Sequence, residues 1–98
     1  MAKKGDFVLV TTDKNGVFAG VLQQWDDDKN TITLEDAQMC VYWSQEMHGL
    51  LGLGQQGPNK DCRITPSVPE LSLNGVTAVI VTTDEAQENW KKKFWSDN

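Results

Sequence analysis

The first half of the chain alternates between short apolar segments and polar turns, which is the pattern of an antiparallel strand meander. Residues 5–11 read G-D-F-V-L-V-T, a run of β-branched and aromatic side chains that predicts a strand. The segment Asp13–Gly16 ends in Asn-Gly, which favours a tight hairpin turn because both residues accept a positive φ. A second strand is therefore expected from Val17 to about Trp25, and Gly20 within it predicts a bulge or a bend.

Two further turns and two further strands are expected before residue 44. The polar segment Asp26–Asn30 predicts a turn, and Thr31–Leu34 alternates as a half-buried strand. Glu35–Ala37 predicts another turn, and Met39–Trp43 reads M-C-V-Y-W, which predicts a fourth strand. Four short strands with tight turns and a bend glycine are typical of a small, strongly bent antiparallel barrel. Residues 5–43 are therefore assigned to a strand meander.

The segment that follows predicts a short helix, a connector and one or more strands. Ser44 is a plausible N-cap for a helix over about residues 44–54, which its glycines weaken. Residues 55–70 contain all three prolines and few apolar side chains, so they predict a connector. Residues 71–82 predict one or two strands, because the turn signal Asn74-Gly75 interrupts an apolar run.

A final helix is expected over residues 84–95. Capping-box patterns begin at both Thr82 and Asp84. Apolar side chains recur at helical spacing to form one stripe, which comprises Ala86, Trp90 and Phe94. No composition shift marks a boundary, so residues 1–98 are expected to form one domain that is mainly β with two helices (α+β).

The charge balance disfavours non-specific binding to nucleic acid. Nine basic and fourteen acidic residues give a net charge of −5, whereas phosphate backbones are bound by clustered Lys and Arg. Lys91–Lys93 is the one basic run, and we interpret it as a solvated helix end that complements the helix dipole. No apolar run reaches the roughly 18 residues that cross a membrane, and Met1–Asp6 lacks a signal-peptide core. We therefore expect a cytoplasmic protein without a membrane partner.

The residues that could support catalysis form no recognisable set. Adjacent strand residues point to opposite faces, so Asp26–Asp28 is better explained as a hairpin turn than as a metal site. Ser44 and His48 share a helix face, but no motif supplies a third group that orients the imidazole. Gly49–Gly54 lacks the Gly-Lys-Ser/Thr ending of a phosphate loop. We expect no enzymatic activity, no metal and no cofactor.

Two cysteines are present and do not form a C-x-x-C motif. Together with the single histidine, Cys40 and Cys62 cannot complete a usual zinc site. Reduced thiols are the simplest expectation, with Cys40 acting as a small buried side chain within a strand. The sequence leaves a disulfide between the two residues open.

Four tryptophans in 98 residues exceed what a small core easily buries. Trp90 lies on the apolar stripe of the last predicted helix and is expected in the core. Trp25 and Trp95 are the better candidates for contact residues. A partly exposed indole beside polar groups is typical either of a protein interface or of a platform on which bases stack.

Several segments in order resemble a family of short uncharacterised phage and prophage proteins with a small Sm-like β-barrel. They are K-K-G-D-F-V-L-V, G-V-F-A-G-V-L, I-T-L-E-D-A, the aromatic strand V-Y-W, V-P-E and V-T-A-V-I-V-T-T. The element G-V-F-A-G-V-L is itself similar to the glycine-bent second strand of Sm-like barrels, whose exposed edges pair between subunits into rings. Sm-like proteins begin with a helix that this chain lacks, so their RNA-binding residues are not transferred.

The resemblance implies a phage-encoded accessory protein, and the tryptophans together with the missing catalytic set favour stoichiometric binding, which we expect from a homo-oligomer. In its most specific form, the protein sequesters a nucleotide signal of bacterial anti-phage immunity at subunit interfaces. Aromatic rings would stack on the base, and basic side chains would contact phosphate. The candidate ligand-binding residues are Trp25, Tyr42, Trp43, Lys60, Arg63 and Trp95.

Two alternatives from another class remain open. The chain is also compatible with a protein-interaction module that inhibits a host protein, or with a minor structural component of the phage. RNA binding in the Sm manner is less expected at this net charge, because it depends on phosphate contacts.

Overall fold

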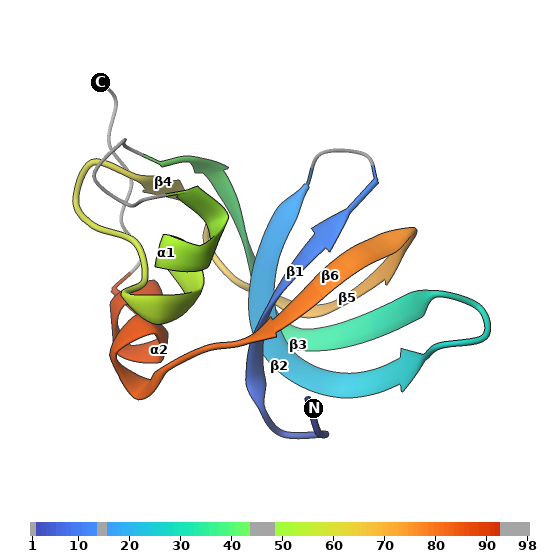
Figure 1. The fold of residues 1–98 in the computed structure, drawn as a ribbon. Coiled ribbons are helices and arrows are strands. Elements are labelled where there is room, and N and C mark those ends of the chain that lie inside the picture. The colour runs from blue at the N-terminus through green and yellow to red at the C-terminus, as the bar shows by residue number, and fades with distance from the viewer. Residues whose placement is uncertain (1, 14–15, 44–48, 93–98) are drawn as a thin grey trace.

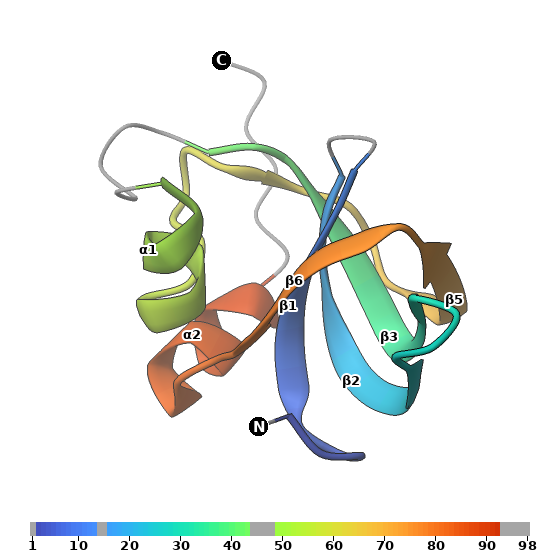
Figure 2. The ribbon, with the colours of Figure 1, turned by 45° about the vertical axis from the view of Figure 1, so that its right-hand side comes forward.

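The chain folds into one curved antiparallel sheet with two short helices on one side of it (Figures 1 and 2). The computed structural model describes residues 2–13, 16–43 and 49–92. In chain order the elements are β1 (Phe7–Thr12), β2 (Val17–Asp26), β3 (Thr31–Tyr42), α1 (Gly49–Gln55), β4 (Arg63–Ile64), β5 (Val68–Asn74), β6 (Val76–Val81) and α2 (Asp84–Trp90).

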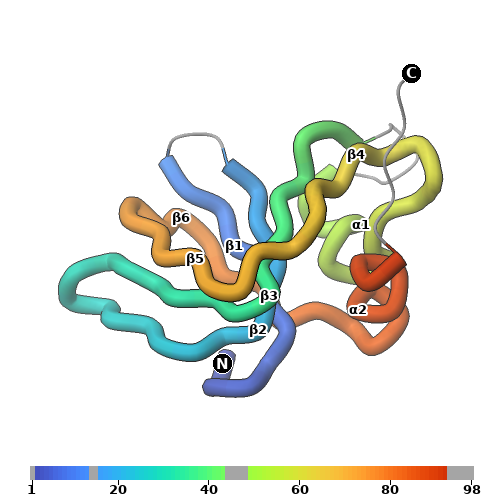
Figure 3. Tube along the Cα trace, turned by 180° about the vertical axis from the view of Figure 1, so that it is seen from behind, coloured from blue at the N-terminus to red at the C-terminus, as the bar shows by residue number. Residues whose placement is uncertain are grey.

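The sheet is bent but not closed. The strand order is β4-β3-β2-β1-β6, and β5 also pairs with β3. Because β2 occupies the other side of β3, strands β4 and β5 follow one another along the same side, as the tube in Figure 3 shows. Among the described strands, none pairs with the outer edge of β6 or of β4 and β5. The predicted barrel is therefore confirmed only as a strongly bent, open sheet.

The bend lies where β2 and β3 pass each other at Gly20 and Asp36. The register of the two strands shifts between Ala19 and Val21, and a Cβ on Gly20 would lie 2.9 Å from the Glu35 carbonyl oxygen. Opposite this glycine, Asp36 has a φ of 50°, a left-handed conformation that Asp tolerates better than most residues. The bulge predicted at Gly20 is confirmed. The turn predicted at Glu35–Ala37 is wrong, because the bulge bends the chain without ending β3.

The second half of the chain departs from the prediction in two places. Strands β4 and β5 begin inside the predicted connector, and Pro69 lies within β5, which it tolerates because β5 is an edge strand. The cap of α2 is neither Thr82 nor Asp84. Thr83 is the N-cap, and its hydroxyl accepts the Ala86 N–H at 3.1 Å. Ser44, the predicted cap of the first helix, lies outside the described residues.

Strand β1 is buried on both faces and separates two apolar clusters. Phe7 and Leu9 face a helix-side cluster, whereas Val8 and Val10 face a strand cluster. The helix-side cluster comprises Phe7, Leu9, Val17, Ala19, Cys40, Leu53, Cys62, Ile64, Ala86 and Trp90. The strand cluster comprises Val8, Val10, Leu22, Ile32, Leu34 and Ala37. The continuous apolar run F-V-L-V therefore reflects a strand that has no solvent face.

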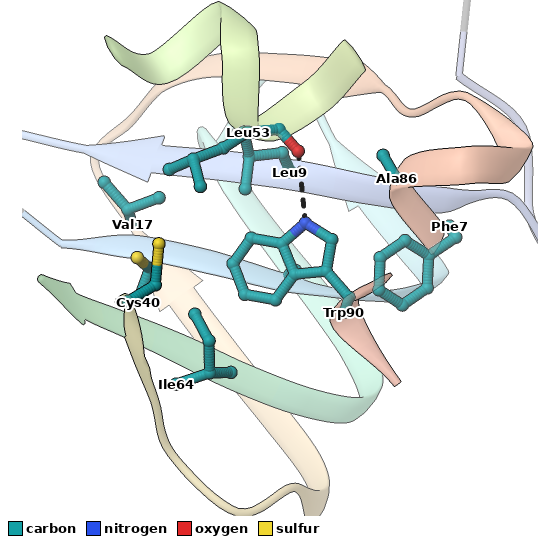
Figure 4. Close-up of a cluster of buried hydrophobic side chains, with 10 residues drawn as sticks. Phe7, Leu9, Val17, Cys40, Leu53, Ile64, Ala86 and Trp90 are labelled. Atoms are coloured by element: carbon teal, nitrogen blue, oxygen red, sulfur yellow. Dashed lines mark hydrogen bonds between the residues drawn. The ribbon is translucent and has the colours of Figure 1, made fainter. Parts of the chain in front are cut away.

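Helix α1 is held by hydrogen bonds from the segment that forms α2. The Trp90 indole Nε1 donates to the Leu53 carbonyl at 3.2 Å inside the helix-side cluster (Figure 4). Thr83 N donates to the Gly54 carbonyl at 3.1 Å, and the Thr83 hydroxyl donates to the carbonyl of Gln55. Asn89 Nδ2 donates to the Gln56 carbonyl at 2.6 Å. The carbonyls at the end of a glycine-rich helix thus find partners that the helix itself does not supply.

Cys40 and Cys62 are free thiols within the helix-side cluster. Cys40 is 4% exposed. Burial, with a smaller effect of the nearby Cys62, raises the pKa of the Cys40 thiol to about 12. A thiol in this state is a packing group and a poor nucleophile.

Replacing Trp90 by Phe is expected to lower the free energy of unfolding by about 2–4 kcal/mol. The change leaves the buried Leu53 carbonyl without its donor and leaves a void in the helix-side cluster. Trp43→Phe is the matched control, since Trp43 is only half-buried, and it should cost about 1 kcal/mol. Urea denaturation measures both. Equal losses would contradict the role assigned to the Trp90 hydrogen bond.

Cys40→Ala is expected to change how stability depends on pH. The folded-state pKa of about 12 lies above the reference value of 9.0, so the stability that comes from a neutral thiol is present below pH 9. It is lost as the pH rises towards 12. The stability advantage of the wild type over Cys40→Ala should therefore shrink by about 1–2 kcal/mol by about pH 10.5. An advantage that stays constant from pH 8 to that value, measured by urea denaturation, would refute this account.

Candidate functional site

Tyr42 and Arg63 lie opposite each other where β3 meets β4. Their backbones are register partners in this antiparallel pair, directly after a register shift between Cys40 and Tyr42. Tyr42 is 48% exposed, and Arg63 is half-buried. An exposed phenol ring beside a guanidinium can stack on a planar ring and contact an anion at the same time.

Two other predicted residues flank this pair. Trp43 follows Tyr42 directly, is half-buried and packs against the helix-side cluster. Lys60 is exposed in the turn that precedes β4, where Asn59 Oδ1 accepts the Asp61 N–H at 2.9 Å. The structure thus brings Tyr42, Trp43 and Arg63 to one end of the sheet, with Lys60 in the adjoining turn.

Trp25 does not belong to this group. It pairs with Ile32 near the β2–β3 turn, ten residues along β3 from Tyr42, and packs against the strand cluster. Its indole Nε1 is buried and has no hydrogen-bond acceptor among the described residues. Trp95 lies outside the described residues. The set predicted from sequence therefore divides into a Tyr42–Arg63 group and a separate Trp25.

A groove that the sequence did not predict lies between the bend of the sheet and α2. It has a volume of about 360 Å³, and we call it the bulge groove. Its walls come from β1, β2, β3, the β4–β5 connection and the end of α2. The lining residues are Phe7, Val21, Asp36, Gln38, Ser67, Gln87 and Lys91. The bend at Gly20 and Asp36 helps to bring these distant segments together, and although Gly20 predicts the bend, no local sequence signal predicts the groove.

Within the described residues, the acidic side chains form no metal site. The Asp26 carboxylate accepts the N–H groups of Asp28 and Lys29 at 3.1 and 3.2 Å, which is a turn arrangement. No group of three or more His, Cys, Asp or Glu residues in the described part of the chain is placed to hold a metal ion. Ser44 and His48 lie outside it.

The helices of the described segments are too short to cross a membrane. Helices α1 and α2 have seven residues each, and neither provides an apolar span of the required length.

Comparison with known proteins identifies a family and a structural neighbour. A heptameric archaeal Sm protein superposes with a TM-score of 0.54 at 17% sequence identity, over 82% of this chain and 90% of that protein. At this identity the likeness shows the fold, which is Sm-like. No curated protein matches the chain. Residues 5–90, which include every strand and helix described above, match the family described as a domain of unknown function (DUF6948). The chain therefore belongs to that family.

Proposed function

We propose that this protein is a non-enzymatic binding protein that holds a nucleotide between the subunits of a homo-oligomer. The observation that carries the proposal is the in-register pair of Tyr42 and Arg63 at the β3–β4 end of the sheet. The ring of Tyr42 offers a stacking face for a base, and Arg63 offers charge-assisted hydrogen bonds to phosphate. Lys60, in the adjoining turn, adds a second positive charge.

The open sheet supports the oligomeric part of the proposal. Unpaired strand edges favour association with another chain, and here β6 presents one edge and β4 with β5 presents the other. Two different edges on one subunit permit head-to-tail contacts, which close into a ring when the rotation between subunits is suitable. The Sm-like neighbour is itself heptameric. The Tyr42–Arg63 pair lies beside the β4 edge and would therefore face a subunit boundary.

The biological setting of the proposal comes from the resemblance to phage and prophage proteins. A phage-encoded binding protein would act in the host cytoplasm during infection. By holding a nucleotide signal of anti-phage immunity in stoichiometric amounts, it would lower the free concentration of that signal without chemistry. This mode of action needs many sites and slow release but no reactive group.

A second candidate is a protein-interaction module that blocks a host protein or joins the phage particle. It is favoured by large apolar side chains on the surface, since Leu51 is 70% exposed and Val41 is 51% exposed. Pull-down of a single host protein by the wild type, lost on Leu51→Asp, together with failure to bind nucleotide, would favour this candidate.

Nucleotide binding is tested by calorimetry with mononucleotides and cyclic dinucleotides, and by mass spectrometry of ligand released on denaturing protein from infected cells. Tyr42→Ala and Arg63→Gln should each weaken binding by about 10-fold or more. Lys29→Gln, which removes a charge in the β2–β3 turn, should leave affinity unchanged. Protein that carries no ligand and binds none of these nucleotides would refute the nucleotide proposal.

Edge-to-edge assembly is tested by native mass spectrometry. Thr82 N donates to the Phe7 carbonyl at 3.3 Å, so the neighbouring Val81 directs its N–H away from β1 towards the open edge. Val81→Lys places a charge on this edge and should shift the oligomer to monomer. Leu51→Lys also adds a charge at an exposed apolar position but lies on helix α1 and not on a strand edge, so it should preserve the oligomer. A monomeric wild type would contradict the assembly.

A further inference from the structure

The bulge groove combines an apolar floor with two opposite charges that come from different elements. Phe7 and Val21 contribute the apolar side chains, and Phe7 is only 8% exposed. Asp36 carries the negative charge from β3, and Lys91 carries the positive charge from the end of α2. Neither side chain forms a hydrogen bond or an ion pair with another residue of the described segments.

Both residues are exposed, and the fold sets the backbone positions from which their side chains extend. Asp36 occupies the left-handed position of the bulge, with a φ of 50°. Lys91 is the C-cap of α2, and its backbone N–H bonds to the Gln87 carbonyl at 3.2 Å. Because Trp90 docks α2 on α1 and packs against the sheet in the helix-side cluster, the fold sets the spacing of the two backbone positions.

A buried amide lies in the wall of the same groove. Gln38 is 6% exposed, and its Nε2 donates to the Thr65 carbonyl at 3.3 Å. Its Oε1 makes no such bond with the residues that the structure describes and can accept a hydrogen bond from a ligand. Gln87 and Ser67 add further polar groups at the rim. An apolar pocket with a few fixed polar groups is the usual form of a small-molecule site.

We propose that the bulge groove binds a small zwitterion, namely an α-amino acid with an apolar side chain. The ligand ammonium pairs with Asp36, the ligand carboxylate pairs with Lys91, and the side chain packs on Phe7 and Val21. The volume of about 360 Å³ lies in the lower part of the range for ligand pockets, which suits a molecule of this size. The Asp36 carboxylate disfavours a phosphate, so this site is distinct from the proposed nucleotide site and does not depend on it.

The test uses isothermal titration calorimetry with L-phenylalanine, L-leucine and L-valine on the wild-type protein. At least one should bind with a Kd of about 1 mM or tighter. Asp36→Asn and Lys91→Gln should each weaken that binding about 10-fold. Asn accepts the left-handed backbone as readily as Asp, so the fold is retained, and circular dichroism checks this. Lys92→Gln removes the neighbouring charge outside the groove and should have no effect.

Derivatives of the best ligand assign each contact. The N-acetyl derivative lacks the ammonium, so it should bind more weakly and be insensitive to Asp36→Asn. The carboxamide derivative lacks the carboxylate, so it should bind more weakly and be insensitive to Lys91→Gln. The proposal is overturned if none of the three amino acids binds at about 10 mM, or if both groove variants bind like the wild type. Derivatives that bind as tightly as the free amino acid would overturn it as well.

Discussion

The fold depends on the hydrogen bonds that α2 and its cap make to the carbonyls at the end of α1. The sequence of α1, G-L-L-G-L-G-Q, has three glycines in seven residues, and a helix this short and this flexible is not stable alone. Trp90, Thr83 and Asn89 satisfy four successive carbonyls, from Leu53 to Gln56. The two helices consequently form one layer, and that layer covers the helix-side cluster on the sheet.

The close packing of the two helices also requires a glycine at position 57, which lies against the backbone of α2. Its φ is +81°, and a Cβ there would lie 2.7 Å from the Ala86 carbonyl oxygen, which is backbone and cannot move aside cheaply. Glycine therefore serves both the left-handed turn that ends α1 and the tight approach of α2. Because Gly57 has no side chain, the end of α1 lies close enough to α2 for the hydrogen bonds between them to form.

The sequence predicted those features that depend on local chemistry. The β1–β2 and β2–β3 hairpins follow from turn residues and β-branched runs, and the bulge follows from Gly20. The long β3 was missed because Glu35–Ala37 has turn composition, whereas pairing with β2 and β5 on both sides of Asp36 continues the strand through the bulge. The sequence analysis named Tyr42 and Arg63 as candidate binding residues. It did not predict that they pair, because the pairing depends on β4, which lies in a segment predicted as a connector. The bulge groove was missed entirely, since its walls are distant in sequence.

The double burial of β1 has a consequence for synthesis of the chain. Its edge pairs with β6, and Phe7 and Leu9 pack in one cluster with residues of α2, yet both partners come much later in the chain. A nascent chain that lacks residues 76–90 leaves an apolar N-terminal strand uncovered. Pairing across some seventy residues of sequence is slow compared with local hairpin formation. Burial of β1 therefore awaits synthesis of residues 76–90, and a chain cut before them exposes an apolar strand that favours aggregation.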